Sequence, residues 1–427
     1  MRPKADVRSV VGTFALGLQL VACTTAEDAR EESGRDAALS HPDDGASTST
    51  GDDAMVDSSE GSERPTDAGL SEAALRALLH VPERMPLPAI PPENPPTAAS
   101  VELGRYLFYD KGLSFNGTTS CGTCHIQALG FADGRARPVG AAGDTLLRNS
   151  MGLQNVAYFA SLTWANRSLI RIEDQIRLPL RGDAPIELGL TEGRDQEVLA
   201  RLAADADYTR RFAEAFPESD TGPTVNKITF ALASFVRTMN GADSPLDRHR
   251  AGDTAALTEQ QRRGLALFQG ERLECFHCHT GTNLTVSYAD ARTTEDTATN
   301  PFFNNGLYNL DGAGSYPANN QGLYQSTANP AHRGMFRPAP LRNIAITGPY
   351  MHDGSKDTLD AVLSHYAAGG SVTVDGQNAG DGRKSPLKSG LVKGFVLSDE
   401  DRAAVLAFFE ALTDPVFIAR EDLSSPF

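Results

Sequence analysis

The chain has 427 residues, of which 40% are hydrophobic and 7% aromatic, so it can hold two or three domains with ordinary hydrophobic cores. Its formal net charge is −16 at pH 7, and its 39 Lys and Arg residues form no basic block. Because a polyanion needs a basic face, nucleic acid is excluded as a partner.

The first residues have the pattern of an export signal. Basic residues precede an apolar run from Val10 to Ala22, which is shorter than the ~20 residues of a comfortable membrane span. The sequence Leu20-Val-Ala-Cys23 resembles a bacterial lipoprotein box, whose cysteine is lipidated. We therefore expect residues 1–23 to be a lipoprotein signal peptide. Cys23 would anchor the protein on the periplasmic side of a bacterial membrane, and we expect this membrane to be the outer one. An ordinary signal peptide, cleaved or retained, is the alternative.

Residues 24–80 are expected to form a disordered acidic tether. From Thr24 to about Asp67 the chain consists of Asp, Glu, Ser, Thr, Gly and Ala with almost no large apolar residues. Such a stretch buries too little surface to offset its ordering entropy. The proline-rich passage that follows, from Val81 to Pro96, is expected to be extended along the folded body.

The remaining chain is predicted to be all-α. Apolar residues recur at helical spacing in several segments, two of which open with a Thr or Ser that can cap a helix, and none alternates convincingly at the period of a strand. The expected helices cover residues 100–108, 197–216, 225–239, 258–268 and 398–412, and long loops rich in Gly, Asn and Pro lie between them, notably residues 300–340.

Four of the five cysteines form two copies of one pattern. The two copies are Cys121-Gly-Thr-Cys124-His125 and Cys275-Phe-His-Cys278-His279. Cys-x-x-Cys-His is the attachment signature of c-type haem, in which the thiols add to two vinyl groups and the His becomes an axial ligand of the iron. A zinc site would need four converging ligands, and a thioredoxin-like dithiol would not need the His. The sequence therefore predicts two covalently bound c-type haems.

A weak repeat accompanies the two motifs. Leu103-Gly-Arg-Tyr-Leu-Phe precedes the first motif, and Arg263-Gly-Leu-Ala-Leu-Phe precedes the second. A helix, then the motif, then loops and later helices is the order of a small cytochrome c domain. We therefore predict two cytochrome c-like domains, residues 81–240 and 241–427, each with one haem.

The second axial ligands determine the chemistry, because an iron with an open face can bind peroxide and a closed one only passes electrons. By residue type, Met335 and Met351 are candidate ligands. His41 falls in the tether, His249 lies in a charged string, and His277 lies inside the second motif, where a surface position is expected.

The chain resembles the bacterial di-haem cytochrome c peroxidase and MauG superfamily, and within it chiefly the MbnH-like di-haem enzymes. The resemblance runs from about Pro88 to the C-terminus. The motifs that carry it include Glu102-Leu-Gly-Arg-Tyr-Leu-Phe-Tyr-Asp, Arg148-Asn-Ser-Met, Leu162-Thr-Trp-Ala-Asn, Pro185-Ile-Glu-Leu-Gly, Gly306-Leu-Tyr-Asn-Leu-Asp, Leu341-Arg-Asn-Ile-Ala, Pro349-Tyr-Met-His-Asp-Gly and His365-Tyr-Ala-Ala-Gly-Gly.

The resemblance implies roles for residues around the first haem. The haem on Cys121, Cys124 and His125 would be the high-spin haem that binds peroxide, with Gln175 and Glu187 on its open face. A carboxylate there can move a proton between the peroxide oxygens, and an amide can orient the ligand. From the residues alone, a solvated loop acid and a helix-surface amide would be the simpler interpretations.

The resemblance also implies a bridge and a second iron ligand. Trp164, the only tryptophan, would lie between the two haems and couple them electronically, although a lone Trp usually packs in a core. Tyr366 would ligate the second iron, on Cys275, Cys278 and His279, because MauG-like members use Tyr there. The peroxidases use Met, which makes Met351 the rival ligand, and a Tyr packed within a helix is the simpler alternative for Tyr366.

A calcium ion between the haems is a further implication of the resemblance. Asn149, Thr347 and Pro349 occupy the matching positions, the latter two through their backbone carbonyls. Hard oxygen donors of this kind suit calcium.

The function that the resemblance implies is a peroxide-dependent di-haem oxidase of the MauG and MbnH type. Hydrogen peroxide would leave the two irons sharing its oxidising equivalents as a bis-Fe(IV) state. The substrate would be a protein oxidised by long-range electron transfer, namely a tryptophan converted to kynurenine on a periplasmic copper-binding partner. Two alternatives stay open: a di-haem cytochrome c peroxidase that takes electrons from a small redox protein, and a non-enzymatic di-haem electron carrier.

Overall fold

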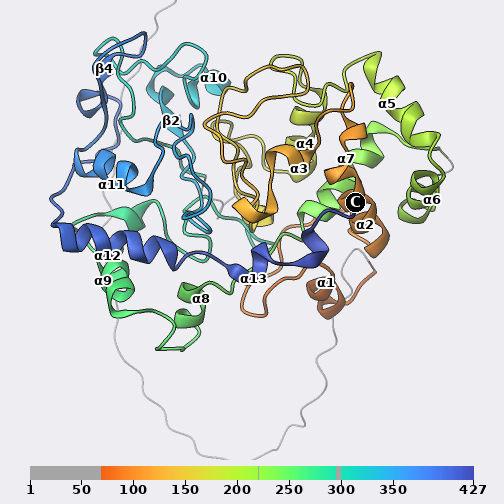
Figure 1. Cartoon of the computed structure of the whole chain (residues 1–427), viewed down its shortest axis with the longest axis horizontal. Helices are drawn as coiled ribbons and strands as arrows, with labels where there is room; N and C mark the ends of the chain where they lie inside the picture. Colours follow the sequence, from red (N-terminus) through yellow and green to blue (C-terminus); the bar gives the residue numbers. More distant parts are fainter. Residues whose placement is uncertain (1–68, 220, 295–299) are drawn as a thin grey trace, which may run out of the picture. The chain divides into compact units, whose positions relative to one another are not determined.

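The computed structural model describes residues 69–219, 221–294 and 300–427 (Figure 1). The expected signal peptide, Cys23, His41 and most of the expected tether lie outside the described residues. The described residues all belong to one compact unit. Within these ranges no helix has both the length and the apolar character needed to cross a membrane.

Helices joined by long irregular loops make up the described chain, which confirms the helix-rich prediction. The helices are α1 (Glu72–Leu78), α2 (Ala98–Tyr109), α3 (Cys121–Cys124), α4 (Ile172–Arg181), α5 (Arg194–Ala203), α6 (Ala206–Ala215), α7 (Val225–Val236), α8 (Pro245–Arg250), α9 (Glu259–Phe268), α10 (Tyr324–Thr327), α11 (Leu359–Ala367), α12 (Asp399–Glu410) and α13 (Pro415–Ile418). Two antiparallel pairs of two-residue strands lie in the loops: β1 (Phe303–Asn304) with β2 (Met335–Phe336), and β3 (Val372–Thr373) with β4 (Gly380–Asp381). These strands are too short to form a sheet layer.

Local capping decides where several helices begin. α9 and α12 begin after the predicted caps Thr258 and Ser398, whose side chains accept hydrogen bonds from backbone N–H groups of the first turn. Residues 197–216, expected as one amphipathic stretch, are divided into α5 and α6. The Asp205 side chain accepts hydrogen bonds from two N–H groups of α6 and so starts a new helix. The apolar periodicity continues across this break and therefore does not reveal it.

Two helix pairs correspond to the internal sequence repeat. α2 packs along α7, and α9 packs along α12 (Figure 1). A Cβ on Gly104 would lie 2.0 Å from the carbonyl oxygen of Ala231, and one on Gly264 would lie 2.0 Å from that of Ala404. The helices of each pair can approach this closely only because the glycine of the repeat has no side chain.

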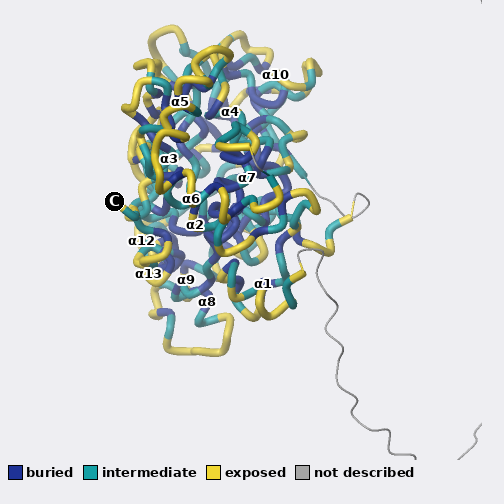
Figure 2. Tube along the Cα trace, turned by 90° about the vertical axis from the view of Figure 1, so that its right-hand side faces the viewer, coloured by how far each residue is buried: buried dark blue, intermediate teal, exposed yellow. Residues whose placement is uncertain are grey.

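Separate hydrophobic clusters surround the two helix pairs, and Figure 2 shows these buried segments inside the trace. The first cluster also contains Phe417 and Leu423 from the C-terminal segment. The chain therefore returns to its first half after α12, so the expected second domain, residues 241–427, does not keep to one cluster.

The start of the described chain differs from the expected tether. Residues 72–78 form α1, and Leu75 and Leu79 are buried in a third cluster together with Tyr158. Tyr158 also donates a 2.7 Å hydrogen bond to the carbonyl of Pro86, so the proline-rich passage lies against the body as expected. The residues just before position 80 are thus part of the folded unit, because leucines at helical spacing give them an apolar face.

Candidate active site

Two cavities open in the folded unit, and each is lined by one Cys-x-x-Cys-His motif. The first cavity, about 580 Å³, is lined by the cysteines and the histidine of the motif at residues 121–125. The second cavity, about 250 Å³, is lined by those of the motif at residues 275–279. The structure therefore places the two motifs in different cavities, as two separate prosthetic groups would require.

The backbone around each motif fixes the orientation of its histidine. Nδ1 of His125 lies 2.7 Å from the carbonyl oxygen of Phe131, and Nδ1 of His279 lies 3.1 Å from that of Leu284. Metal-bound histidines usually donate their other ring N–H to such an acceptor. Nε2 is therefore the nitrogen that each ring would offer to iron.

The surroundings of the cysteines argue against a reactive dithiol and against zinc. Burial raises the pKa of Cys121, Cys124 and Cys275 to about 12 and that of Cys278 to about 11. Redox-active dithiols instead have a depressed thiol pKa. Within the part of the chain that the structure describes, no cysteine belongs to a group of three or more His, Cys, Asp or Glu ligand atoms close enough to share an ion.

Two polar side chains predicted through the family resemblance line the first cavity. Gln175 lies on α4, and Glu187 lies in the loop that follows it. Burial raises the pKa of Glu187 to about 7. Oε1 of Gln175 is buried and has no hydrogen-bond partner among the described residues. Neither side chain is the solvated surface group that the residues alone would suggest.

Trp164 is shared by the two cavities. It is among the lining residues of each. Nε1 of Trp164 donates to the carbonyl oxygen of Asn149 at 2.9 Å, and the Trp164 carbonyl accepts from the N–H of Arg337 at 2.9 Å. The ring packs against a small cluster that contains Tyr316 and Phe336. Trp164 therefore lies where the two cavities adjoin.

Two side chains that could bind iron line the second cavity. Tyr366 lies on α11, and Met351 lies in the loop before it. Burial raises the pKa of the Tyr366 phenol to about 12, partly offset by a hydrogen bond with the Asn305 side chain. Nδ2 of Asn305 lies 3.5 Å from Sδ of Met351, so one amide contacts both candidates. Met335 and His249 line neither cavity.

The three residues expected to hold calcium also line the second cavity. They are Asn149, Thr347 and Pro349. Nδ2 of Asn149 donates to the carbonyl of Arg135 at 2.9 Å, which leaves the amide oxygen for another partner. Amide and carbonyl oxygens are the donor types that calcium prefers.

Several residues of the second cavity were not predicted from the sequence. Arg337 is 2% exposed, contacts Sδ of Met151 at 3.1 Å, and has no carboxylate partner among the described residues. Burial lowers the pKa of its guanidinium to about 10. His352 stacks on Phe336 with ring centroids 3.6 Å apart. The sequence feature that could have indicated a buried Arg337 is its position among apolar and Pro residues, in Phe336-Arg-Pro-Ala-Pro.

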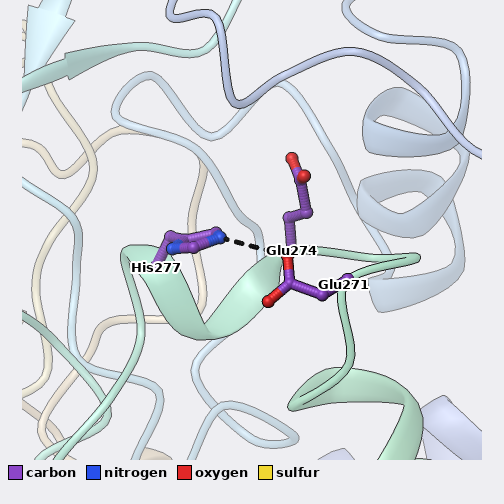
Figure 3. Close-up of side chains that lie close together, drawn as sticks. All are labelled: Glu271, Glu274 and His277. Atoms are coloured by element: carbon purple, nitrogen blue, oxygen red, sulfur yellow. Dashed lines mark ion pairs between the residues drawn. The ribbon is translucent and has the colours of Figure 1, made fainter.

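Glu271, Glu274 and His277 lie together beside the second motif (Figure 3). Their ligand atoms are all within 4.8 Å of one another. Glu274 is paired with Lys393 at 3.1 Å, and Nε2 of His277 lies 3.8 Å from the Glu271 carboxylate, whose side chain is 79% exposed. Glu271 is exposed, whereas Glu274 and His277 are only partly exposed, so His277 lies nearer the interior than the surface position expected from the sequence.

Comparison with known proteins identifies relatives of this arrangement. Residues 98–255 match the di-haem cytochrome c peroxidase family, and this segment contains the first motif, Trp164, Gln175 and Glu187. The chain is 34% identical over 340 residues to the methylamine utilization protein MauG of Methylorubrum extorquens, covering 80% of this chain and 84% of that protein. It is 31% identical over 278 residues to the cytochrome c551 peroxidase of Pseudomonas aeruginosa, covering 64% and 74%. A crystal structure of a MauG-like protein associated with microbial copper homeostasis is 44% identical with a TM-score of 0.79, covering 81% of this chain and 98% of that one.

Proposed function

The chain belongs to the di-haem cytochrome c peroxidase and MauG family of oxidoreductases, and from that membership we propose that it is a peroxide-dependent di-haem oxidase that acts on a protein substrate. One observation carries the proposal: Trp164 lines both cavities, and each cavity is lined by one Cys-x-x-Cys-His motif. Two redox centres joined by one aromatic ring can share oxidising equivalents and draw electrons from a distant donor. The substrate therefore need not enter either cavity.

The residues present fit haem. Four thiols would form the thioether links, and His125 and His279 would supply the axial nitrogens. The Arg337 guanidinium is buried and has an N–H group with no partner among the described residues, so it would suit a carboxylate of the ring substituents. Bound in these cavities, haem would supply redox-active iron and a conjugated ring over which charge can spread.

In the first cavity the chain's own side chains would handle the protons of peroxide. The Glu187 carboxylate would accept the proton of the inner oxygen and deliver it to the outer, departing oxygen. A pKa of about 7 lets one group perform both steps near neutral pH. The amide oxygen of Gln175, which has no hydrogen-bond partner among the described residues, would accept a hydrogen bond from peroxide and orient it.

At the second cavity we favour Tyr366 as the protein ligand. A phenolate is a hard anionic donor that stabilises high oxidation states, which suits an oxidase that stores oxidising equivalents. Coordination would lower the phenol pKa far below the value of about 12 that burial gives the free side chain. The oxygen donors of Asn149, Thr347 and Pro349 would hold a calcium ion between the haems.

The MbnH-type reaction is the finer part of the proposal. The 44% identical MauG-like protein is associated with microbial copper homeostasis, which supports a copper-binding protein as the substrate. On that partner, a tryptophan would be converted to kynurenine. A lipidated Cys23 would hold the enzyme on the periplasmic side of the membrane, where it would meet such a partner.

Spectroscopy and mass spectrometry test this proposal. The haem-loaded enzyme should contain one high-spin ferric haem. Peroxide should produce a long-lived near-infrared absorption band that arises from charge shared between the two haems. Two low-spin haems would instead indicate an electron carrier. Mass spectrometry of a co-expressed copper-binding partner after peroxide treatment should show a mass change on tryptophan. An unmodified partner would remove the substrate assignment but leave the haem chemistry in place.

A conventional cytochrome c peroxidase is the second candidate function. The presence of Met351 in the second cavity favours it, because a thioether ligand raises the reduction potential. Tyr366→Phe and Met351→Leu separate the two functions. With Tyr366 as the ligand, only Tyr366→Phe should change the absorption spectrum of the second haem and raise its potential. A change confined to Met351→Leu would support the peroxidase.

A further inference from the structure

Electrons from a protein substrate need a route to the two cavities. Trp164 is the only tryptophan in the chain and lines the cavities themselves, so it cannot also be the outer end of that route. Tyrosine is the other side chain that undergoes reversible one-electron oxidation readily. A relay tyrosine needs two properties: packing that connects it to Trp164, and an acceptor for its phenol proton.

Tyr308 has the packing. Together with Trp164 and Met351, it lies against the small buried cluster that contains Tyr316 and Phe336. The ring centroids of Tyr308 and Tyr316 are 5.5 Å apart, and those of Tyr316 and Phe336 are 6.1 Å apart. Trp164 and Phe336 line the second cavity. Aromatic rings therefore follow one another from that cavity to Tyr308.

Tyr308 also has the proton acceptor. Its phenol donates a 2.6 Å hydrogen bond to Oδ2 of Asp353. The other oxygen, Oδ1, accepts from the N–H of Ser355 at 3.0 Å, which holds the carboxylate in place. A phenol that loses an electron becomes a strong acid. A carboxylate already hydrogen-bonded to it can take the proton without rearrangement.

Other tyrosines have a carboxylate partner but lack the aromatic connection. Tyr208 donates to Asp110 at 2.8 Å, and Tyr288 donates to Asp290 at 3.3 Å. Neither tyrosine belongs to the cluster around Trp164, against which Tyr308 packs. The combination of the two properties therefore distinguishes Tyr308 from these pairs.

We propose that Tyr308 is a redox relay through which electrons from the protein substrate reach the haem cavities. The inference rests on the proposed function, because the peroxide-oxidised haem pair is the oxidant. Tyr308 loses one electron to that pair and its phenol proton to Asp353, which gives a neutral tyrosyl radical and a protonated carboxyl group. The substrate then supplies one electron to the radical, and Asp353 returns the proton. Tyr308 is half-buried, so part of the residue remains accessible at the surface.

The test uses the haem-loaded enzyme and peroxide without a substrate. Freeze-quench EPR of the wild-type protein should show a tyrosyl radical, which ring-deuterated tyrosine should narrow. Tyr308→Phe should abolish this signal and prolong the near-infrared band several-fold, because the oxidised pair loses its internal electron donor. Tyr208→Phe is the matched control. It also removes a phenol that donates to a carboxylate, at 2.8 Å, but this tyrosine lines neither cavity.

Asp353→Asn provides a second, independent variant. It keeps the phenol but removes the proton acceptor, so it should weaken the radical signal and slow the decay of the band. It also carries the test should Tyr308→Phe fail to retain haem. An unchanged signal and decay in both variants, the lack of any tyrosyl signal in the wild type, or an equal effect in the Tyr208→Phe control would overturn the inference. A wild-type enzyme that never forms the near-infrared band would instead overturn the proposed function.

Discussion

Burial gives Glu187 a pKa of about 7, well above the usual value for a Glu carboxyl group. The ionised form is the one that can accept a proton from peroxide, so the rate of the reaction with peroxide should rise with pH through about 7 and level off above it. Glu187→Gln should remove this pH step and slow the reaction by roughly 10²–10⁴-fold, the usual contribution of a positioned acid–base group. Stopped-flow measurement of the Soret absorption over a range of pH would record both effects.

Glu192→Gln is the matched control for that variant. Glu192 lies close by in the sequence, but it is exposed and lines neither cavity. Its removal changes the net charge by the same amount and should leave the rate and the pH step unchanged. A pH step that persisted in Glu187→Gln would assign the titration to another group.

At the residue scale, a site residue could be predicted from the sequence only where its neighbours along the chain reveal its role. The two Cys-x-x-Cys-His motifs were identifiable by themselves, because attachment of haem fixes their spacing. The roles of Gln175 and Glu187 came only from the family resemblance, since burial of a loop acid is not visible in its neighbours along the chain. Arg337 and Asn305 were missed because their positions depend on contacts with distant residues, such as Met151 and Tyr366.

At the scale of elements, the glycine in each helix crossing gives a direct prediction. A Cβ on Gly264 would lie 2.0 Å from the carbonyl oxygen of Ala404, so Gly264→Ala should force α9 and α12 apart. Overpacking of this kind costs about 1–3 kcal/mol. Gly104→Ala should have a similar effect on α2 and α7. Denaturant unfolding of the haem-loaded protein would measure the loss of stability.

Gly222→Ala is the control for the crossing variants. A Cβ at this position would meet nothing within 4 Å. It should therefore leave the unfolding midpoint unchanged or raise it slightly, because alanine restricts the unfolded chain. Equal stability of Gly264→Ala and the wild type would show that α12 can shift without loss of packing.

The helices were more predictable than the loops between them. Periodicity and capping residues located α2, α9 and α12 because both signals are local. The pairing of β1 with β2 joins Asn304 to Met335 across a long loop, and no alternation along two residues could reveal it. The break between α5 and α6 was hidden for the opposite reason, since one capping residue, Asp205, interrupts an otherwise continuous pattern.

At the scale of the whole molecule, a buried hydrogen-bond network ties the two halves together. Asn343 donates from Nδ2 to Oε1 of Gln154 at 2.6 Å, and its Oδ1 accepts from the N–H of Asp414 at 2.8 Å. Phe417 then extends the C-terminal segment into the first hydrophobic cluster. The sequence predicts two successive domains because its motifs repeat, but a return of the chain end to the first half depends on these long-range contacts and has no local signature.

Asp414 is the member of this network whose substitution should test how the halves are coupled. Its side chain is 0% exposed. Oδ2 of Asp414 accepts hydrogen bonds from Nε2 of Gln154 and from the N–H of Asp243, both at 3.0 Å. Oδ1 accepts a hydrogen bond from the N–H of Phe417 at 2.9 Å. Asp414→Asn would bring an NH₂ group among these donors and leave at least one of them unpaired, at a cost of about 1–3 kcal/mol.

The loss should appear both in stability and in communication between the cavities. The denaturation midpoint should fall, and the near-infrared band formed with peroxide should weaken. The resting spectrum of each haem should stay unchanged, because the network sets how the halves meet and not how each half binds its haem. Asp375→Asn, at an exposed position, is the control and should change neither quantity. A lower midpoint with an undiminished band would mean that the network stabilises the fold without controlling the coupling through Trp164.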